Sequence, residues 1–275
     1  MQRRLTLIWL AGVLLSTGCI TARNYTSPQT PRYAGEPPPH LVNTTPSDTI
    51  KVISFNIAFA VQIDSALKVL TTDDALRGAD IILLQEMDLP AVRYIARVLG
   101  MSYVYYPATK HFVHQKDFGN AVLSRWPIVS DSKIVLPYHA RVWKTARTAT
   151  AATIRIDTMT VRVYSTHLGT YANITNTQRR EQMETIIKDA APFSRVILGG
   201  DMNDPGVGTV AVSHGYSWPT RDGPPTATIG RLDHIFFRGL FSPDSAAAGT
   251  VVNTRNASDH RPIWAVGILR KRMAQ

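Results

Sequence analysis

The chain has 275 residues, of which 44% are hydrophobic and 18% are charged, and this composition predicts one large globular core. Its formal net charge of +10 favours contact with anionic material such as nucleic acid, lipid head groups or the surface of a cell envelope. The single cysteine, Cys19, excludes a disulfide framework.

Residues 1–18 have the pattern of a signal peptide. Two arginines precede an apolar run over 5–15, which is too short to span a bilayer. The following Leu15-Ser16-Thr17-Gly18-Cys19 resembles a bacterial lipobox, although Ser16 stands where Leu is commonest. We expect Cys19 to be lipidated and to hold the protein in the bacterial cell envelope, on the periplasmic or outer-membrane face. An ordinary secretory signal with an incidental cysteine is the alternative.

Residues 19–49 are predicted to be the lipidated cysteine and a tether. Six prolines interrupt a stretch rich in Thr, Ser and Asn, and it has no apolar periodicity. Extended at about 3.1 Å per residue, such a segment could hold a domain several nanometres from a membrane. The globular domain is expected over 50–270. Removing the two signal-peptide arginines from the +10 total leaves +8 on the mature chain.

The domain contains strand and helix patterns in a mixed order that does not strictly alternate, and it has no internal repeat. Short β-branched and apolar runs predict strands at 50–57, 79–85, 103–106, 119–124, 128–136, 148–156, 161–165, 195–198, 232–237 and 263–267. Apolar spacing of three and four residues predicts helices at 65–77, 89–99 and about 177–190. Two adjacent strand pairs have the pattern of hairpins. This order favours an α/β domain in which two mixed sheets pack face to face and helices flank them.

Five short polar motifs lie at or near the ends of these strands. They are Ser54-Phe55-Asn56-Ile57, Gln85-Glu86, Thr166-His167-Leu168, Gly200-Asp201-Met202-Asn203-Asp204 and Ser258-Asp259-His260-Arg261-Pro262. A set of polar groups at the tips of several strands is costly to bury unless a metal and a substrate satisfy it. The motifs therefore predict one convergent site for chemistry on a phosphate.

Together these motifs resemble the endonuclease/exonuclease/phosphatase (deoxyribonuclease-I-like) superfamily. The resemblance extends from residue 51 to about 266 and includes the run Gly119-Asn120-Ala121-Val122-Leu123-Ser124-Arg125-Trp126-Pro127-Ile128, Arg179, and Arg231-Leu232-Asp233-His234-Ile235-Phe236. It implies a four-layer α/β sandwich. It also implies a hydrolase that cleaves phosphoesters, most often phosphodiesters, by in-line attack of metal-assisted water.

The resemblance assigns a metal to three residues. Glu86 would be the main ligand of Mg²⁺ or Mn²⁺, Asn56 would lie beside it, and Asp259 would contact the ion directly or through water. Arg147 is a candidate for binding a substrate phosphate. We expect Gln85 to support the site by hydrogen bonding.

The catalytic residues implied by the resemblance are His167, Asp201, Asn203, Asp233 and His260. His167 would donate a hydrogen bond to a phosphoryl oxygen, and Asn203 would stabilise the charge that develops on the phosphate. Asp233 would orient the imidazole of His260. Either Asp201 or His260 would be the general base. Adjacent glycines before Asp201 allow the sharp turn that aims Asp201 and Asn203 at one point.

The sequence leaves two substrate classes as alternatives, nucleic acid and a phospholipid head group. The positive charge favours nucleic acid, whereas the predicted lipid anchor favours a membrane lipid. Trp143 and Trp218 are isolated in the sequence and do not predict an aromatic hairpin for membrane entry. We expect a monomer. A non-catalytic envelope lipoprotein that binds phosphate or lipid is the alternative.

Overall fold

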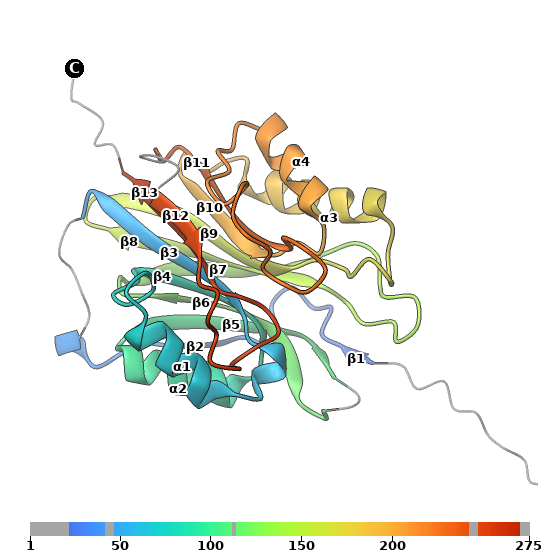
Figure 1. The fold of residues 1–275 in the computed structure, drawn as a ribbon, viewed down its shortest axis with the longest axis horizontal. Coiled ribbons are helices and arrows are strands. Elements are labelled where there is room, and N and C mark those ends of the chain that lie inside the picture. Colours follow the sequence, from blue (N-terminus) through green and yellow to red (C-terminus); the bar gives the residue numbers. More distant parts are fainter. Residues whose placement is uncertain (1–21, 42–46, 112–113, 242–246, 270–275) are drawn as a thin grey trace, which may run out of the picture.

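A computed structural model describes residues 22–41, 47–111, 114–241 and 247–269 (Figure 1). The predicted signal peptide and Cys19 lie outside these residues. No helix in the described ranges is both long and apolar enough to cross a membrane. Two β-sheets form the centre of the molecule, and helices lie on their outer faces.

Within the described residues, the larger sheet has eight strands. Its hydrogen-bonded order is β1 (Arg23–Asn24), β5 (Ser102–Lys110), β6 (Asp117–Ser124), β4 (Ile81–Met87), β3 (Thr49–Asn56), β13 (Ile263–Ile268) and β12 (Ala248–Thr250), and β2 (Tyr33–Gly35) also pairs with β5. Strands β3 and β4 run parallel, whereas the pairs on either side of them are antiparallel. The carboxyl ends of β3 and β4 therefore lie at the same edge of the sheet.

The second sheet has five strands in the order β11 (Asp233–Arg238), β10 (Val196–Asp201), β9 (Met159–His167), β8 (Thr148–Ile156) and β7 (Ile128–Val135). Strands β9 and β10 run parallel, and the other neighbours are antiparallel. Each sheet thus contains one parallel pair, and the two pairs together supply most of the polar strand ends predicted from the sequence.

Helices α1 (Ile63–Thr72) and α2 (Leu89–Leu99) cover the larger sheet, and α3 (Asn176–Ala190) and α4 (Gly208–Ser213) cover the smaller one (Figure 1). Short 3₁₀ turns lie at Pro39–Leu41, Ala58–Ala60 and Pro205–Val207. Three separate apolar cores fill the spaces between the four layers. The fold is the four-layer α/β sandwich that the sequence predicted.

The alternation of side chains along the strands builds these cores. On β3, Ile53 and Phe55 pack under the helices, whereas Val52 faces the other sheet. On β4, Ile82 and Leu84 likewise pack under the helices. Because successive strand residues point to opposite faces, each buried strand contributes to two cores at once. For this reason the amino-acid sequences of the buried strands are nearly continuous apolar runs.

Local signals set the ends of the two best-predicted helices. Asp88 caps α2 by accepting the backbone N–H of Ala91, and Gly100 ends the helix in a left-handed conformation. Thr175 and Gln178 form a reciprocal capping box at the start of α3. The prediction for α1 was wrong at its end, which was placed at residue 77. The chain leaves the helix at Asp73, whose side chain accepts the N–H of Ala75 instead.

The proline-rich tether predicted for residues 19–49 needs a correction over 22–35. There the chain pairs with β5 through both β1 and β2. Lys133, which is almost completely buried, donates hydrogen bonds to the carbonyls of Tyr25 and Thr30, and Arg32 forms a bidentate ion pair with Asp131. This segment is part of the folded domain, and its lack of apolar periodicity reflects binding by backbone and polar contacts.

Candidate active site

Strand register brings the predicted polar residues to one end of the space between the sheets. Asn56 ends β3 opposite Gln85 of β4. In the other sheet, Asp201 ends β10 and stands between His167 of β9 and Asp233 of β11. Each of the five shares its strand face with residues that point into the core between the sheets, such as Val52 and Ile197. The five side chains therefore converge.

Glu86 reaches the same space by a different route. Strict alternation along β4 would place it with Ile82 and Leu84, under the helices. The register between β4 and β6 shifts between Leu84 and Met87, and Glu86 has a φ of 59°. A bulge of this kind redirects one side chain, and here it turns the carboxylate toward the other sheet. The left-handed conformation is strained for a residue with a Cβ atom.

Asn56 links the two carboxylates of the site. Its Nδ2 lies 3.2 Å from Oε1 of Glu86 and 3.1 Å from Oδ2 of Asp201, and its Oδ1 accepts the N–H of Ala58. The backbone N–H of Phe59 donates to the other Glu86 oxygen at 3.1 Å. In this arrangement Asn56 holds the carboxylates in place, while its own oxygen is already bonded to the backbone.

Gln85 has the supporting role expected from the sequence. It is fully buried, donates to Ser165 Oγ at 3.0 Å, and accepts from Ser54 at 3.4 Å. Ser165 also donates to the carbonyl of Leu84. These bonds connect the two sheets directly below the site, so they fix the spacing between the residues that each sheet contributes.

His167 lies between the two carboxylates. Its Nε2 is 3.3 Å from Oδ2 of Asp201, and its Nδ1 is 3.7 Å from Oε1 of Glu86. Burial, together with the positive charges of Arg147 and His260, holds the pKa of His167 well below its usual range. The lowered pKa favours the neutral ring, and its Nδ1 is buried without a hydrogen-bond partner, so the ring is available to a phosphate oxygen.

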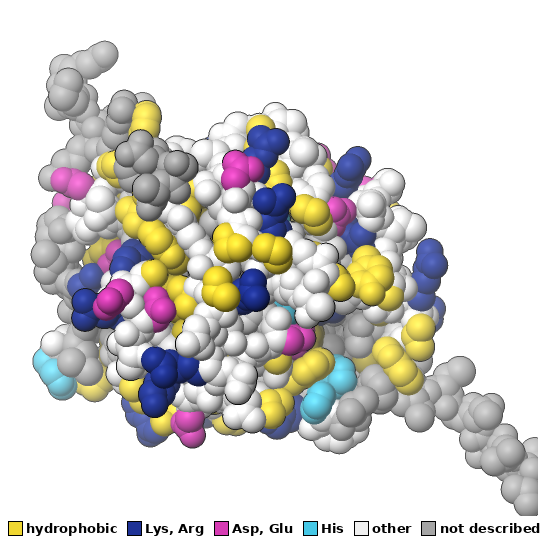
Figure 2. Space-filling view, in the orientation of Figure 1, with side chains coloured by type: hydrophobic (Ala, Val, Ile, Leu, Met, Phe, Trp, Pro, Cys, Tyr) yellow, Lys and Arg dark blue, Asp and Glu magenta, His cyan; other side chains and the backbone are white. Residues whose placement is uncertain are grey.

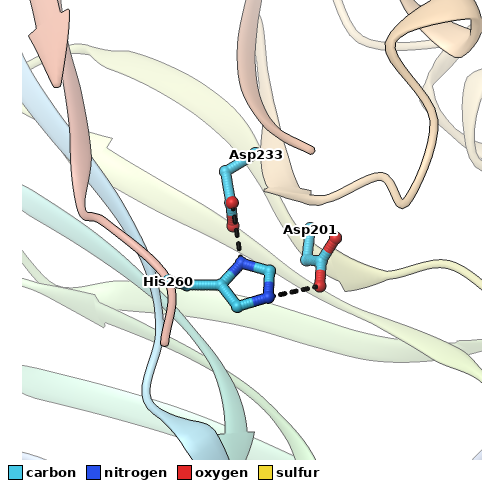
Figure 3. Close-up of side chains that lie close together, drawn as sticks. All are labelled: Asp201, Asp233 and His260. Atoms are coloured by element: carbon cyan, nitrogen blue, oxygen red, sulfur yellow. Dashed lines mark hydrogen bonds and ion pairs between the residues drawn. The ribbon is translucent and has the colours of Figure 1, made fainter. Parts of the chain in front are cut away.

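The ring of His260 lies between Asp233 and Asp201 (Figure 3). Its Nδ1 is 2.8 Å from Oδ2 of Asp233, and its Nε2 is 3.8 Å from Oδ2 of Asp201. Burial alone would lower the pKa of His260, but the charge and hydrogen bond of Asp233 and the charge of Asp201 outweigh it and raise the pKa to about 10. Burial and repulsion from Asp233 raise the pKa of Asp201.

Arg147 also belongs to the site. Its Nη1 is buried without a hydrogen-bond partner, and its guanidinium lies over the ring of Phe118, 5.3 Å from the centroid. Burial lowers the pKa of Arg147, while the carboxylates of Glu86 and Asp201 raise it. A guanidinium beside these acids is suited to a phosphate oxygen.

Asn203 marks the margin of the site. Its backbone N–H donates to Asp201 at 2.9 Å, and its side chain donates to the carbonyl of Leu168 at 3.0 Å. Gly200 makes this turn possible, because its φ is 147° and a Cβ there would lie 1.9 Å from the carbonyl oxygen of Thr166. A cavity of about 460 Å³ begins at Asn203 and is bordered by Tyr171 and other residues.

Asp259 is placed differently from the other predicted residues. It is exposed, and Ser258 donates a 3.3 Å hydrogen bond to it. Its negative charge contributes to the raised pKa of the neighbouring His260. Asp259 therefore lies next to the site, on its solvent side, and outside the network that joins the buried residues.

Sequence reasoning missed an aromatic cluster beside the site. Phe59 packs against His111 edge to face and against His114 at a tilt, with ring centroids 4.8 and 4.4 Å apart, and the ring of Phe118 lies 5.8 Å from the ring of His167. Neither the two histidines nor the two phenylalanines are among the site residues predicted from the sequence. Phe59 lies in a turn with positive φ, and no periodicity in the sequence signals such a position.

The donor set fits a hard divalent cation. Three largely buried carboxylates, those of Glu86, Asp201 and Asp233, outnumber the permanent cations close to them, and burial raises the pKa of Glu86. Ligand atoms of Asp201, Asp233 and His260 lie within 4.8 Å of one another. Because Oδ2 of Asp233 is already bound to His260, Glu86 is the stronger candidate ligand. Carboxylate oxygens suit Mg²⁺ or Mn²⁺.

Solved structures of other proteins share this fold. An endonuclease/exonuclease/phosphatase from Bacteroides vulgatus is 13% identical, with a TM-score of 0.65 and coverage of 82% of this chain and 100% of that one. D. rerio TDP2, complexed with a single-strand DNA product, is 16% identical, with a TM-score of 0.62 and coverage of 80% and 99%. The Bacteroides thetaiotaomicron VPI-5482 mannosyl-6-phosphatase Bt3783 is 17% identical, with a TM-score of 0.60 and coverage of 80% and 100%.

At these identities the likeness to solved structures shows the fold. No curated protein sequence matches the chain. A family model described as "Endonuclease/Exonuclease/phosphatase family" matches residues 53–260, from the third residue before Asn56 to the catalytic candidate His260. Members of this family are phosphoester hydrolases and generally use divalent metals. The sequence motifs, the four-layer fold and the family model agree, and the chain belongs to the endonuclease/exonuclease/phosphatase family.

Proposed function

We propose that this protein is a divalent-metal-dependent hydrolase that cleaves a phosphodiester by in-line attack of water. The observation that carries the proposal is the convergence of Glu86, Asn56, His167, Asp201 and the Asp233–His260 pair within one hydrogen-bonded network. Arg147 lies beside that network with a buried, unpartnered nitrogen. A bound phosphate would supply the oxygens that Arg147 and His167 lack.

The metal would be held principally by Glu86, with Asn56 securing that carboxylate and Asp259 on the solvent side. When bound, a divalent ion supplies Lewis-acid stabilisation of the phosphate and lowers the pKa of water. The unpaired Oδ1 of buried Asp233 and the raised pKa of Glu86 both indicate a site that gains from a positively charged guest.

The protein residues divide the remaining work. Asp201, whose pKa is raised by burial and by Asp233, takes the proton from the attacking water. The protonated ring of His260, which Asp233 orients, supplies the proton that the leaving oxygen needs. The new bond joins the water oxygen to phosphorus as one ester P–O bond breaks, so the products are an alcohol and a phosphomonoester. His167, Arg147 and Asn203 stabilise charge on the phosphoryl oxygens.

A substrate panel tests the reaction. Full-length protein is assayed with Mg²⁺ or Mn²⁺ on bis-p-nitrophenyl phosphate, plasmid DNA, RNA, sphingomyelin and phosphatidylinositol, each with and without EDTA. We expect cleavage of at least one diester that EDTA abolishes. The proposal is wrong if none of the five is cleaved, or if EDTA leaves the rate unchanged. The pattern across the panel separates nucleic acid from lipid head groups as the substrate class.

We also propose that the protein is a monomer held on the envelope membrane by lipid attached to Cys19. The support is the sequence of residues 1–19, in which a basic start and an apolar run end in small residues before the only cysteine. Metabolic labelling with a radioactive fatty acid in a bacterial host is expected to label the protein. A protein that is exported without label would contradict the anchor.

A further inference from the structure

We infer that the domain lies directly against the membrane, through a small basic and apolar surface next to its N-terminal strand. This membrane-facing patch consists of Arg23, Arg141, Val142, Trp143 and Lys144. The inference rests on the proposed lipid anchor at Cys19 and replaces the distant tether expected from the sequence. The occupant of the patch is the surface of an anionic lipid bilayer.

The first argument is the short distance along the chain from Cys19 to the folded domain. Ala22 is already buried against the domain, and its N–H donates to the carbonyl of Trp143 at 3.0 Å. Only residues 20 and 21 lie between Ala22 and Cys19. Three residues span roughly 10 Å even when fully extended. A lipid on Cys19 therefore brings the Trp143 region close to the membrane surface.

The second argument is that the N-terminal strand and the patch are fastened together. Asn24 Nδ2 donates to the carbonyl of Lys144 at 2.7 Å, and Asn24 Oδ1 accepts the N–H of Ala146 at 2.8 Å. Strand β1 also lies next to β5, where Arg23 pairs with Lys110. The loop between β7 and β8 lies beside β1 in Figure 1. An anchored N-terminus fixes the orientation of this loop toward the bilayer.

The third argument is the shape and composition of the loop tip. Two backbone bonds, from Ala140 to Thr145 and from Lys144 to Ala140, close the tip at 3.0 and 3.1 Å. Val142 is 65% exposed there and Trp143 is 41% exposed. Tryptophan with an apolar neighbour and flanking basic residues is typical of a membrane interface.

The fourth argument is charge. No Asp or Glu occurs in residues 1–35 or in residues 132–156, which include both parts of the patch. Arg23, Arg141 and Lys144 are exposed. In Figure 2, dark blue and yellow side chains lie near one another at the right-hand edge, which the loop between β7 and β8 reaches in Figure 1. Each such basic residue near an anionic leaflet strengthens binding about fivefold.

A fluorophore attached at the patch tests this orientation. Val142→Cys is labelled with an environment-sensitive probe in the full-length acylated protein, which is then reconstituted into phosphatidylglycerol–phosphatidylethanolamine vesicles. Val98→Cys on α2, 50% exposed in the unchanged protein, is the matched control. We expect the emission at 142 to shift to shorter wavelength and to be quenched by nitroxide-labelled lipids. The probe at 98 should do neither.

Charge removal makes the test sharper. Adding Arg141→Gln and Lys144→Gln should lower the ratio of membrane-inserted to water-exposed probe at 142 by about 25-fold, and phosphatidylcholine vesicles should have a similar effect. A probe at 142 that stays in water while the protein floats with the vesicles overturns the inference and leaves the anchor intact. Protein that does not float with the vesicles would overturn both the membrane orientation and the lipid anchor.

Two further results separate this inference from its competitors. Unsubstituted protein should take no probe, because acylation blocks the thiol of Cys19, and labelling there would contradict the anchor. Single-stranded DNA added in place of vesicles should not change the probe emission. A spectral shift with DNA that exceeds the shift with vesicles would identify the patch as a nucleic-acid surface and overturn the membrane assignment. Diesterase activity on a soluble substrate is measured separately, so its loss is not confused with loss of docking.

Discussion

At the scale of single residues, the site depends on how one carboxylate is turned. Glu86 faces the reaction centre only because a bulge and a left-handed φ of 59° override the alternation of β4. Phe59 and Asn56 then hold both carboxylate oxygens. Strained residues of this kind persist where the surrounding structure fixes them, and they concentrate at functional sites.

Replacing Glu86 tests its role as the main metal ligand. Glu86→Gln keeps the shape and removes the charge, and it should lower kcat/KM by about 10²–10³-fold, since several kcal/mol of metal-assisted stabilisation would be lost. Steady-state kinetics at increasing Mn²⁺ measure the loss. Glu184→Gln, which changes a carboxylate paired with His214 on the outer helices, is the control and should match the unchanged protein. Equal rates for both variants would exclude Glu86 as a ligand.

The Asp233–His260 pair should behave as one catalytic unit. Asp233→Asn and His260→Ala should each lower kcat by about 10²–10⁴-fold, the range that general acid–base catalysis supplies. The double variant should be scarcely worse than His260→Ala, because effects within one unit are not additive. If the loss of kcat in the double variant equals the product of the two single losses, Asp233 and His260 have independent roles. Metal affinity, measured by calorimetry, should change little, and a large fall in His260→Ala would identify His260 as a ligand.

At the scale of elements, polar contacts bind the N-terminal segment to the sheets. Residues 22–35 form two short strands that pair with β5. Lys133 and Asp131 of β7 bind the chain within this segment. Lys133 is 4% exposed, and burial lowers its pKa from 10.5 to about 8. A lysine without a carboxylate in its hydrogen bonds carries a desolvation cost whenever it is charged.

This cost predicts an unusual rise of stability with pH. The folded state loses the Lys133 proton near pH 8, whereas the unfolded chain holds it until about 10.5, so the unfolded state binds more protons between these values. The free energy of unfolding should therefore increase from pH 8 to 10 relative to Lys133→Met, measured by urea denaturation of both proteins. Lys68→Met, on the exposed face of α1, is the matched control. A difference that does not change with pH would contradict the lowered pKa.

At the scale of the whole molecule, the fold places chemistry at one end of the space between the sheets. The two parallel pairs, β3–β4 and β9–β10, end there, and their carboxyl termini supply Asn56, Gln85, His167 and Asp201. Basic side chains are distributed over the face seen in Figure 2. The chain's net charge of +10 favours contact with anionic surfaces, and the proposed lipid anchor and membrane-facing patch would give that attraction a direction.

The anchor makes a prediction for the whole protein in a cell. Cys19→Ser should move the protein from the membrane fraction to a soluble or unprocessed form, because the acylation site is lost. Fractionation followed by detergent partitioning measures the change, and Ser16→Leu, which brings the lipobox closer to the common pattern, should stay with the membrane. Identical fractionation of the Cys19→Ser and unchanged proteins would refute lipidation.

The sequence by itself determined the layers of the domain and pointed to most of the polar residues that the fold brings together. Strand and helix patterns reproduced the ten main strands and the three longer helices, because each buried strand carries a nearly continuous apolar run. Polar residues at the ends of such runs can be recognised without coordinates. Edge strands β1, β2 and β12 were missed because they are two or three residues long and bind through their backbones.

Only the tertiary structure decided the features that depend on two distant segments. Glu86 is redirected by a register shift against β6, and Phe59 enters the site through a left-handed turn. Residues 22–35 join the domain because Lys133, about a hundred positions later, donates hydrogen bonds to two of their carbonyls. Asp259 stays on the solvent side although it adjoins buried His260. Local sequence patterns report periodicity and turn chemistry, whereas these positions are set by partners that come together only when the sheets pack.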